Sequence, residues 1–458
     1  MRSLTPSLAI SALCLLTWFG CSSAGGTDTS NAGAGGGGGA ASSAGGAGGS
    51  STITGGMGAG TAAGGSDGSA GGSFQGASML KGKVVAPNGT IPISGALVYL
   101  ASSPPAAIPD GVYCDKCVHL AQGIPYATTN PDGTFELAAN PGDQYLIVQK
   151  GAFRRVRSLT VAAGAQDIPL AMTTLPPKMD KANGDDVPKI AVVAGAWDPI
   201  EVVLARMGLA ATISKDFIGK QRVLGKDAVG FAVYGLHDIG EQSPHPDSIK
   251  LLTDPNEISQ YHIVFIPCSG GTDNGGDPNA PKCTAVFDTD AKVKSTLDGF
   301  VKQGGRMYVS DWSYEYVRQV FPGFLSWQGE GTQIGSACQD GGGEQNVTNA
   351  DAGLMSWLTA QGQTLTSVKD AWTYVTSVHP KADVDPNGQP VTSTPKVWVE
   401  AESKPASTSF QHGCGRSLYT TYHTQPTSET NAGLEPQALA LLYMILEVGV
   451  CVDPLIPG

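Results

Sequence analysis

The chain is short of charge, and of positive charge above all. Only 15% of its 458 residues are charged, with 28 Lys and Arg against 40 Asp and Glu, so the net charge is −12 at pH 7. Basic and acidic residues are interspersed, and no Lys/Arg-rich run interleaved with aromatic residues occurs. A nucleic-acid-binding surface needs such a concentration of basic side chains. The sequence therefore argues against a nucleic-acid partner.

Long apolar runs are also scarce. The run at residues 8–19 follows Arg2 and is too short to cross a bilayer as a mature helix. It ends in Gly20-Cys21, which resembles the lipobox of bacterial lipoproteins, although aromatic residues stand where that motif has a small aliphatic pair. The resemblance implies a signal peptide over residues 1–21, a diacylated Cys21 and attachment to a membrane through that lipid. Cleavage by an ordinary signal peptidase is the alternative.

Lys and Arg are absent from residues 22–77, where 22 of 56 residues are glycine and only Asp28 and Asp67 are charged. Such a segment has too little apolar surface to offset the chain entropy lost on folding. We predict a disordered Gly/Ala/Ser tether, with an r.m.s. span of roughly 40 Å. The length of this tract resembles tethers on myxobacterial envelope lipoproteins. An exported protein of the cell envelope, at the outer membrane or cell surface, is therefore expected.

Seven cysteines follow the tether, and pairing is plausible in an oxidising envelope. We expect a short disulfide between Cys114 and Cys117 in preference to a metal or redox pair, because a zinc site would need further ligands and only His119 lies near. Cys268 and Cys283 flank a loop of Gly, Asn, Asp and Pro, and we expect a second disulfide to close it. Cys414 and Cys451 flank the last expected strand and helix and could pair with each other or with Cys338, and the sequence does not choose between these pairings. An odd number leaves at least one thiol free within the chain.

Residues 78–175 alternate apolar and polar positions in short β-rich runs. The turn Asn130-Pro-Asp-Gly133 separates two of these runs, which is a strong hairpin signal. The pattern predicts a small β-sandwich. The order of a G-A-x-V-x-L strand, a T-T-x-x-D-G-x-F-x-L turn and a P-G-x-x-Y strand resembles the carboxypeptidase regulatory-like domain. That resemblance implies a structural or docking module without catalysis.

Residues 187–452 read as strands that alternate with helices. Apolar strands are expected at 189–194, 261–266, 306–310 and 416–423, with helices at 198–207, 290–303 and 434–448. Asp198 and Pro199 are expected to cap and begin the first helix. Continuous apolar strands between helices predict a parallel sheet covered on both faces. We therefore expect a multi-domain chain in which a small β-sandwich precedes an α/β, flavodoxin-like doubly wound sheet, after the disordered Gly-rich tether.

Three segments of this second unit resemble the class I glutamine amidotransferase-like superfamily, including its trehalose-utilisation-like branch. They lie at residues 261–271, 304–311 and 415–425. In active members a strand-to-helix elbow carries a nucleophilic Cys, a Gly-rich loop helps to bind the oxyanion, and a late His-x-Glu completes the triad. The resemblance places Asp311 at the elbow, His423 and Gln425 at the triad positions, and an oxyanion-like loop at three residues, which are Ser269, Gly270 and Gly271.

Two of these positions depart from an active enzyme. Asp311 has no thiol or hydroxyl to attack a carbonyl, and neutral Gln425 cannot stabilise an imidazolium as a carboxylate does. Two catalytic alternatives remain: Ser313 facing His423, or an acid/base or metal cluster of Asp311, Glu315 and His423. We expect Asp311 instead to cap the helix that follows it. Trp312 and Tyr314 are as suited to packing as to stacking on a ligand.

The sequence thus predicts a lipid-anchored envelope protein with a non-catalytic amidotransferase-like domain that binds a glycan or protein partner at the surface. An envelope hydrolase using Ser313 or the Asp311/Glu315/His423 cluster is the alternative. An Asp-rich run at 383–388 has the spacing of calcium ligands but lacks the acid at its twelfth position, so we expect a turn there. No metal and no cofactor are predicted.

Overall fold

A computed structural model describes residues 76–115, 120–121, 123–195, 197–210, 214–215, 221–222, 230–235, 248–268, 291–339, 342–385, 387–424 and 434–448. The expected signal peptide, with Cys21, and the tether up to residue 75 lie outside the described residues. No helix within the described ranges has both the length and the apolar character needed to cross a bilayer.

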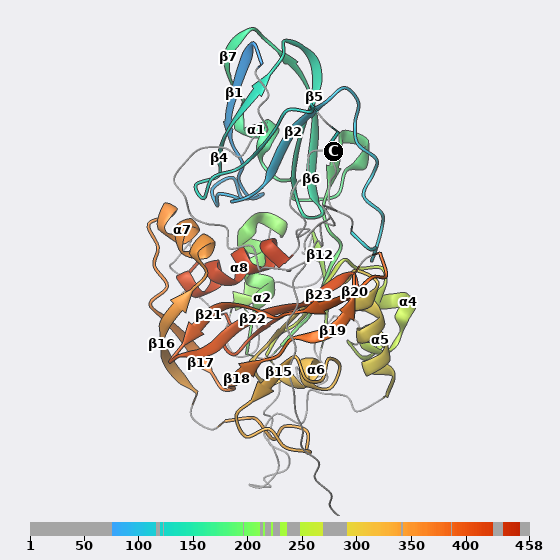
Figure 1. The fold of residues 1–458 in the computed structure, drawn as a ribbon, viewed down its shortest axis with the longest axis vertical. Helices are drawn as coiled ribbons and strands as arrows, with labels where there is room; N and C mark the ends of the chain where they lie inside the picture. The colour runs from blue at the N-terminus through green and yellow to red at the C-terminus, as the bar shows by residue number, and fades with distance from the viewer. Residues whose placement is uncertain are drawn as a thin grey trace, which may run out of the picture. The chain divides into compact units, whose positions relative to one another are not determined.

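Two antiparallel-rich sheets form the first part of the described chain (Figure 1). One has the order β4-β1-β7 and the other the order β3-β2-β5-β6-β8. Alternate strand residues such as Leu80, Val98 and Phe135 are buried in a shared core. The strand bounds are β1 Ser78–Lys83, β2 Leu97–Ala101, β3 Tyr126–Thr128, β4 Thr134–Ala139, β5 Gly142–Lys150, β6 Phe153–Val161, β7 Gly164–Asp167 and β8 Asp185–Asp186.

The turn expected at residues 130–133 is present, but it does not make a hairpin. Gly133 takes a φ of 82°, its N–H donates to the Asn130 carbonyl, and Asp132 accepts from the Thr134 N–H. The strands on either side do not pair with each other, because β3 pairs with β2 and β4 pairs with β1. The turn therefore carries the chain from one sheet to the other.

Strand β6 carries three arginines that pair with two aspartates of β8. Arg154 bonds to Asp186, while Arg155 and Arg157 both bond to Asp185. The Arg154 and Asp186 side chains are 8% and 5% exposed. The segment after residue 175 thus adds a strand to the five-stranded sheet, and the basic residues of β6 bind carboxylates of their own chain.

A nine-stranded sheet organises the rest of the described chain, in the order β12-β9-β13-β14-β23-β22-β21-β16-β17. The pairings from β12 to β23 are parallel, and those from β23 to β17 are antiparallel. The α/β class is confirmed, with an antiparallel extension that was not expected. The bounds are β9 Ile190–Val193, β12 Phe231–Tyr234, β13 Ile263–Ile266, β14 Arg306–Ser310, β16 Gly343–Ala350, β17 Ser367–Ala371, β21 Lys396–Ala401, β22 Lys404–His412 and β23 Gly415–Thr420.

Successive residues of the parallel strands enter different cores, one on each face of the sheet. Val192, Phe265 and Tyr308 belong to the core that contains α2, α7 and α8, whereas Val193 and Val264 belong to the core that contains α3, α5 and α6. Helices therefore cover both faces, as Figure 1 shows. Their bounds are α2 Ile200–Leu204, α3 Ser248–Thr253, α4 Pro255–Ile258, α5 Ala291–Lys302, α6 Glu315–Arg318, α7 Ala352–Ala360 and α8 Pro436–Val448.

Smaller elements complete the described chain. Strands β15 and β18 pair with each other, as do β19 with β20 and β10 with β11. The Asp-rich run forms the turn between β19 and β20, where Asp385 accepts from the N–H groups of Asn387 and Gln389. The bounds are α1 Leu170–Thr173, η1 Lys181–Asn183, η2 Ala205–Leu209, β10 Ser214–Lys215, β11 Gln221–Arg222, η5 Asp311–Tyr314, β15 Leu325–Trp327, β18 Val375–Val378, β19 Lys381–Val384 and β20 Pro390–Ser393.

The disulfides differ from those expected. Cys114 bonds to Cys414, across a sequence separation of 300, and not to Cys117. Cys268 is a free, buried thiol, so it does not pair with Cys283. Cys338 is disulfide-bonded, while Cys117, Cys283 and Cys451 lie outside the described residues. The predicted Cys114–Cys117 pairing was wrong because folding brings Cys414, which precedes β23, to the loop that holds Cys114.

Candidate functional site

The strand-to-helix corner at Asp311 has an unusual backbone. Strand β14 ends at Ser310, and η5 and α6 follow at once. Asp311 takes a φ of 44°, a left-handed conformation that few residues with a side chain adopt. Such strain costs of order 1–3 kcal/mol and is held only by the surrounding structure. The corner thus has the sharp, strained geometry of a strand-to-helix nucleophile elbow.

Asp311 does not cap the helix that it precedes, contrary to our expectation. The N-cap position belongs to Ser310, which makes no capping hydrogen bond with its side chain. Asp311 is 0% exposed, and its Oδ1 accepts from the Trp372 N–H and the Thr373 hydroxyl, each at 3.0 Å. Its carbonyl accepts from the Tyr419 hydroxyl at 3.1 Å. These three hydrogen bonds hold the backbone of Asp311 in its strained conformation.

The second carboxylate oxygen of Asp311 faces two other reactive groups. The Cys268 Sγ lies 3.8 Å from Oδ2, and the His423 Nε2 lies 4.0 Å from the same oxygen. One donor atom from each of the three residues lies within 4.8 Å of the others, and all three residues are buried. We call these three residues, Cys268, Asp311 and His423, the strand-end cluster. They follow β13, β14 and β23, whose carboxyl ends meet at one edge of the parallel sheet.

Asp198 ties together the backbone segments that carry this cluster. Its carboxylate accepts from the Ser310 hydroxyl and from both the N–H and the hydroxyl of Thr424. The Ser310 oxygen in turn accepts from the Cys268 N–H at 2.8 Å. Asp198 is therefore not the helix cap that the sequence suggested, since α2 has no side-chain cap. It positions the chain neighbours of Asp311 and His423, and through Ser310 it is linked to Cys268.

Burial dominates the electrostatics of the cluster. It raises the pKa of the Asp311 carboxyl well above 3.8, although the hydrogen bond from Thr373 opposes this shift. Burial also raises the pKa of the Cys268 thiol well above 9.0, and the neighbouring Asp311 charge adds to the shift. A thiol in such surroundings stays protonated and is a poor nucleophile.

Ser313 and Glu315, which the two catalytic alternatives from the sequence use, both bond to groups outside the cluster. The Ser313 hydroxyl donates to the Pro267 carbonyl at 2.8 Å. Glu315 pairs with Arg318 at 2.8 Å and accepts from the Gly335 N–H. Asp311–Tyr314 form η5, a 3-10 turn and not a turn of α-helix, so Glu315 does not share an α-helical face with Asp311. Of the five expected site residues, the structure brings together Asp311 and His423, while Gln425 lies outside the described residues with the loop of Ser269, Gly270 and Gly271.

Aromatic side chains surround this edge of the sheet. Tyr314 is 0% exposed and packs against Trp327, so it is a core residue. Trp312 packs edge-to-face with Trp372 at a centroid separation of 5.6 Å. Trp197 follows β9, its N–H donates to the Cys268 carbonyl, and its residue is 40% exposed. Among the described residues, Trp197 is an exposed large side chain at this edge that a ligand can reach.

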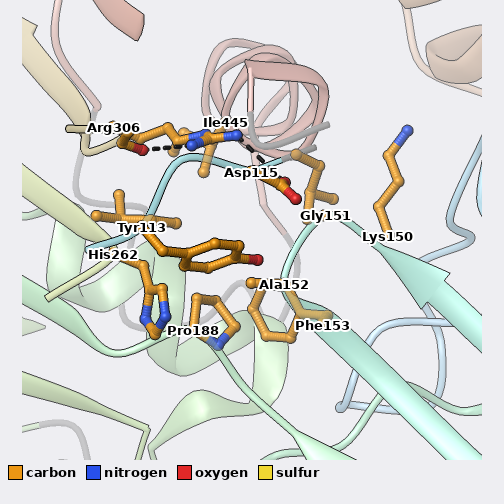
Figure 2. A pocket seen from close by; sticks show the side chains of 13 residues that line it. Tyr113, Asp115, Lys150, Gly151, Ala152, Phe153, Pro188, His262, Arg306 and Ile445 are labelled. Carbon is orange, nitrogen blue, oxygen red and sulfur yellow. Dashed lines mark hydrogen bonds and ion pairs between the residues drawn. The ribbon is translucent and has the colours of Figure 1, made fainter. Parts of the chain in front are cut away.

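A small cavity lies at the opposite edge of the sheet, where the strands begin. Figure 2 shows Tyr113, Pro188 and His262 around it, with Arg306 close to Asp115. Its volume is about 30 Å³, which holds one or two water molecules. Arg306 and Asp115 are paired at 3.5 Å. We interpret this cavity as part of the packing around the Cys114–Cys414 disulfide and not as a ligand site.

Neither a protein-family model nor a curated protein sequence matches the chain. Solved structures with similar folds include the cytoplasmic protein STM3548 from Salmonella typhimurium, at 11% identity and a TM-score of 0.30, over 57% of this chain and 98% of that one. A second cytoplasmic protein, STM1381 from Salmonella typhimurium LT2, is 12% identical with a TM-score of 0.29, over 57% of this chain and 100% of that one. A beta-galactosidase from Bacillus circulans sp. alkalophilus is 12% identical with a TM-score of 0.24, over 57% of this chain and 31% of that one. Likenesses at this level carry no functional argument, so the function rests on the chain's own geometry.

Proposed function

We propose that this chain is an exported, lipid-anchored envelope protein whose amidotransferase-like domain binds a glycan at the carboxyl edge of its sheet and does not catalyse amide transfer. One observation carries the proposal. The elbow position holds a buried carboxylate, whose Oδ1 is bound by Trp372 and Thr373, where catalysis would need a nucleophile. Trp197, exposed at the same edge, supports the binding part of the proposal, because a partly exposed indole offers an apolar face and a polar edge to a sugar ring.

A binding experiment with the full chain in detergent tests this function. Immobilised peptidoglycan fragments and outer-membrane polysaccharides serve as the probes. We expect one of them to be retained by the wild-type chain, and Trp197→Ala to weaken that binding at least about tenfold, since truncating an aromatic anchor typically costs more than 1 kcal/mol. Leu170→Ala is the matched control, because Leu170 is 43% exposed and lies on α1, far along the chain from this edge. Equal binding by the wild-type and Trp197→Ala chains would remove the glycan proposal in favour of a protein partner.

The envelope location is a separate part of the proposal and rests on residues 1–77 alone. Metabolic labelling with an alkyne fatty acid should mark the wild-type chain and not Cys21→Ser. The variant should also move from the membrane fraction to the soluble fraction, because a second anchor is not expected. Labelling of both chains, or of neither, would contradict lipidation at Cys21.

A cysteine hydrolase is the second candidate, because the Cys268 Sγ and a nitrogen of His423 lie within 4.8 Å. Burial of the thiol and its raised pKa weigh against this function. The rate at which Cys268 is alkylated in the native chain separates the two candidates, since a nucleophile must be both accessible and ionised.

A further inference from the structure

The strand-end cluster presents three different metal-binding atoms to one point inside the protein. A thiol sulfur, a carboxylate oxygen and an imidazole nitrogen come from Cys268, Asp311 and His423, which are 1%, 0% and 7% exposed. They are contributed by three adjacent strand ends, so no local sequence motif explains their meeting.

We propose that the strand-end cluster binds one divalent metal ion of the zinc class, with the Cys268 Sγ, the Asp311 Oδ2 and the His423 Nε2 as ligands. The mixture of donors selects the metal. Mg²⁺ and Ca²⁺ prefer all-oxygen ligand sets, whereas sulfur together with imidazole nitrogen favours Zn²⁺ and the ions that resemble it. A thiolate and a carboxylate together would balance the charge of a divalent cation in the buried site.

The distances between the three donors suit a tetrahedral ion after a small closure. In a tetrahedral zinc site the ligand atoms lie roughly 3.3–3.7 Å from one another. The sulfur and the nitrogen lie 3.8 and 4.0 Å from the Asp311 Oδ2, and no pair exceeds 4.8 Å. Side-chain rotations that move each donor atom by less than about 1 Å would bring the donors to the metal–ligand bond lengths of such a site. Three protein ligands leave the fourth position of the ion to water or another donor.

Surrounding hydrogen bonds already hold the ligands in place, as the outer shell of a metal site does. The Oδ1 of Asp311 is bound by Trp372 and Thr373, which leaves Oδ2 to face the other donors. The His423 carbonyl accepts from Gln437 at 2.6 Å, and Asp198 holds the next residue, Thr424. In this proposal the ion joins the ends of β13, β14 and β23. It goes beyond the proposed function and does not depend on glycan binding.

Cobalt substitution in the full chain tests the site. The chain is first treated with a chelator and then titrated with Co²⁺ at neutral pH. We expect one equivalent to bind, with the intense visible absorption of a tetrahedral ion and a near-ultraviolet charge-transfer band from the thiolate. The isosteric change Cys268→Ser should abolish that charge-transfer band. Asp311→Asn and His423→Ala should each weaken binding by at least about 100-fold, since even changes in the outer shell of metal sites cost 10–100-fold.

His379→Ala is the matched control, because His379 is exposed and its ring contacts the hydroxyls of Ser326 and Ser377, away from the cluster. It should bind Co²⁺ as the wild-type chain does. Circular dichroism establishes that each variant is folded. If another variant does not fold, Asp311→Asn tests the metal site, because it keeps an oxygen that can accept from Trp372 and Thr373. The proposal is overturned if the wild-type chain gives no stoichiometric cobalt spectrum, or if Cys268→Ser gives an unchanged one.

Discussion

Asp311 combines a strained backbone with a carboxylate that satisfies buried donors. The φ of 44° disfavours any residue with a Cβ, and the hydrogen bonds from Trp372, Thr373 and Tyr419 hold the residue there. A helix cap would have explained the residue more simply, but its side chain makes no capping hydrogen bond at the helix start. The Oδ1 of Asp311 therefore serves as a structural acceptor at the corner that follows β14.

Substitutions at Asp311 should separate these two contributions. Asp311→Ala leaves the Trp372 N–H and the Thr373 hydroxyl without their acceptor. Alanine also has a Cβ, so the backbone strain at this position remains. We expect a loss of about 2–3 kcal/mol in the free energy of unfolding. Asp311→Gly loses the same hydrogen bonds but relieves the backbone, and should be about 1 kcal/mol more stable than Asp311→Ala. Urea unfolding measures both. Equal stabilities for the two variants would show that the backbone is not strained.

The reactivity of Cys268 reports whether the strand-end cluster is poised for nucleophilic chemistry. Burial raises the pKa of this thiol, and the residue is 1% exposed, so alkylation should require local opening of the structure. We expect iodoacetamide to modify Cys268 in the native, metal-free chain at least about 100-fold more slowly than in the chain unfolded in urea. Mass spectrometry of the Cys268 peptide measures the rates. Fast native alkylation at neutral pH would instead favour the cysteine hydrolase.

At the scale of elements, the parallel strands could be predicted from the sequence, whereas their antiparallel neighbours could not. Strands β9, β13 and β14 are buried on both faces and so appear as continuous apolar runs. Strand β22 mixes Lys, Pro, Ser and Thr with only two apolar side chains, Ala406 and Phe410, and it is held by pairing with β21 and β23. The pattern of apolar residues in a sequence predicts whether a strand is buried better than it predicts which strands pair.

The candidate site could be predicted only in part, for a related reason. The strand ends that hold Asp311 and His423 follow from the α/β pattern. The Asp-Pro pair at 198–199 gives a strong helix-start signal, yet the Asp198 carboxylate bonds to Thr424, 226 residues away. Cys268 follows the strand expected at 261–266, but the nearby Cys283 favoured a loop disulfide. Contacts between residues so far apart depend on the folded sheet and leave no local pattern.

The arginine–aspartate contact between β6 and β8 should make stability depend on pH. Burial of Asp185 alone would raise its pKa, but the hydrogen bonds from Arg155 and Arg157 outweigh this, so the pKa lies below 3.8. The stabilisation is thus complete above pH 3.8 and is lost as the pH falls through the folded-state pKa. At pH 7, Asp185→Asn should cost about 2–3 kcal/mol, and the difference from the wild type should shrink below pH 3.8.

Urea unfolding at several pH values measures this dependence. The matched control is Glu136→Gln, which breaks an exposed ion pair with Lys81 whose side chains are 50% and 54% exposed. It should leave stability nearly unchanged at every pH, because exposed pairs contribute little. A difference between wild type and Asp185→Asn that stays constant from pH 7 to pH 2 would contradict this account of the arginine–aspartate contact.

At the scale of the whole molecule, the β-rich part and the α/β part are joined covalently and by packing. The Cys114–Cys414 disulfide links them, the Trp357 indole N–H of α7 donates to the Pro92 carbonyl, and Lys150 of β5 pairs with Glu447 of α8. Gly304 has a φ of 114°, and a Cβ there would lie 1.9 Å from the Tyr113 carbonyl oxygen, so only glycine fits. Within the described residues, these contacts belong to one compact unit.

Removing the disulfide should destabilise this unit as a whole. The bond closes a loop of about 300 residues, and the entropy of the unfolded chain then predicts a loss of about 5–6 kcal/mol for the double variant Cys114→Ser/Cys414→Ser. The loss should appear as a lower midpoint in urea, and non-reducing peptide mapping should recover the Cys114–Cys414 pair from the wild-type chain. An unchanged midpoint, or a Cys114–Cys117 peptide, would contradict the observed pairing.

Hydrolysis of amides and esters tests the central claim most directly, because we propose that the domain is catalytically silent. The full chain is assayed against a panel of amide and ester substrates, with and without Zn²⁺, beside three variants, Cys268→Ser, Asp311→Asn and His423→Ala. We predict that the wild-type chain gives no turnover above that of the variants under either condition. Turnover by the wild-type chain that disappears in any of these variants would contradict the claim and make the strand-end cluster an active site.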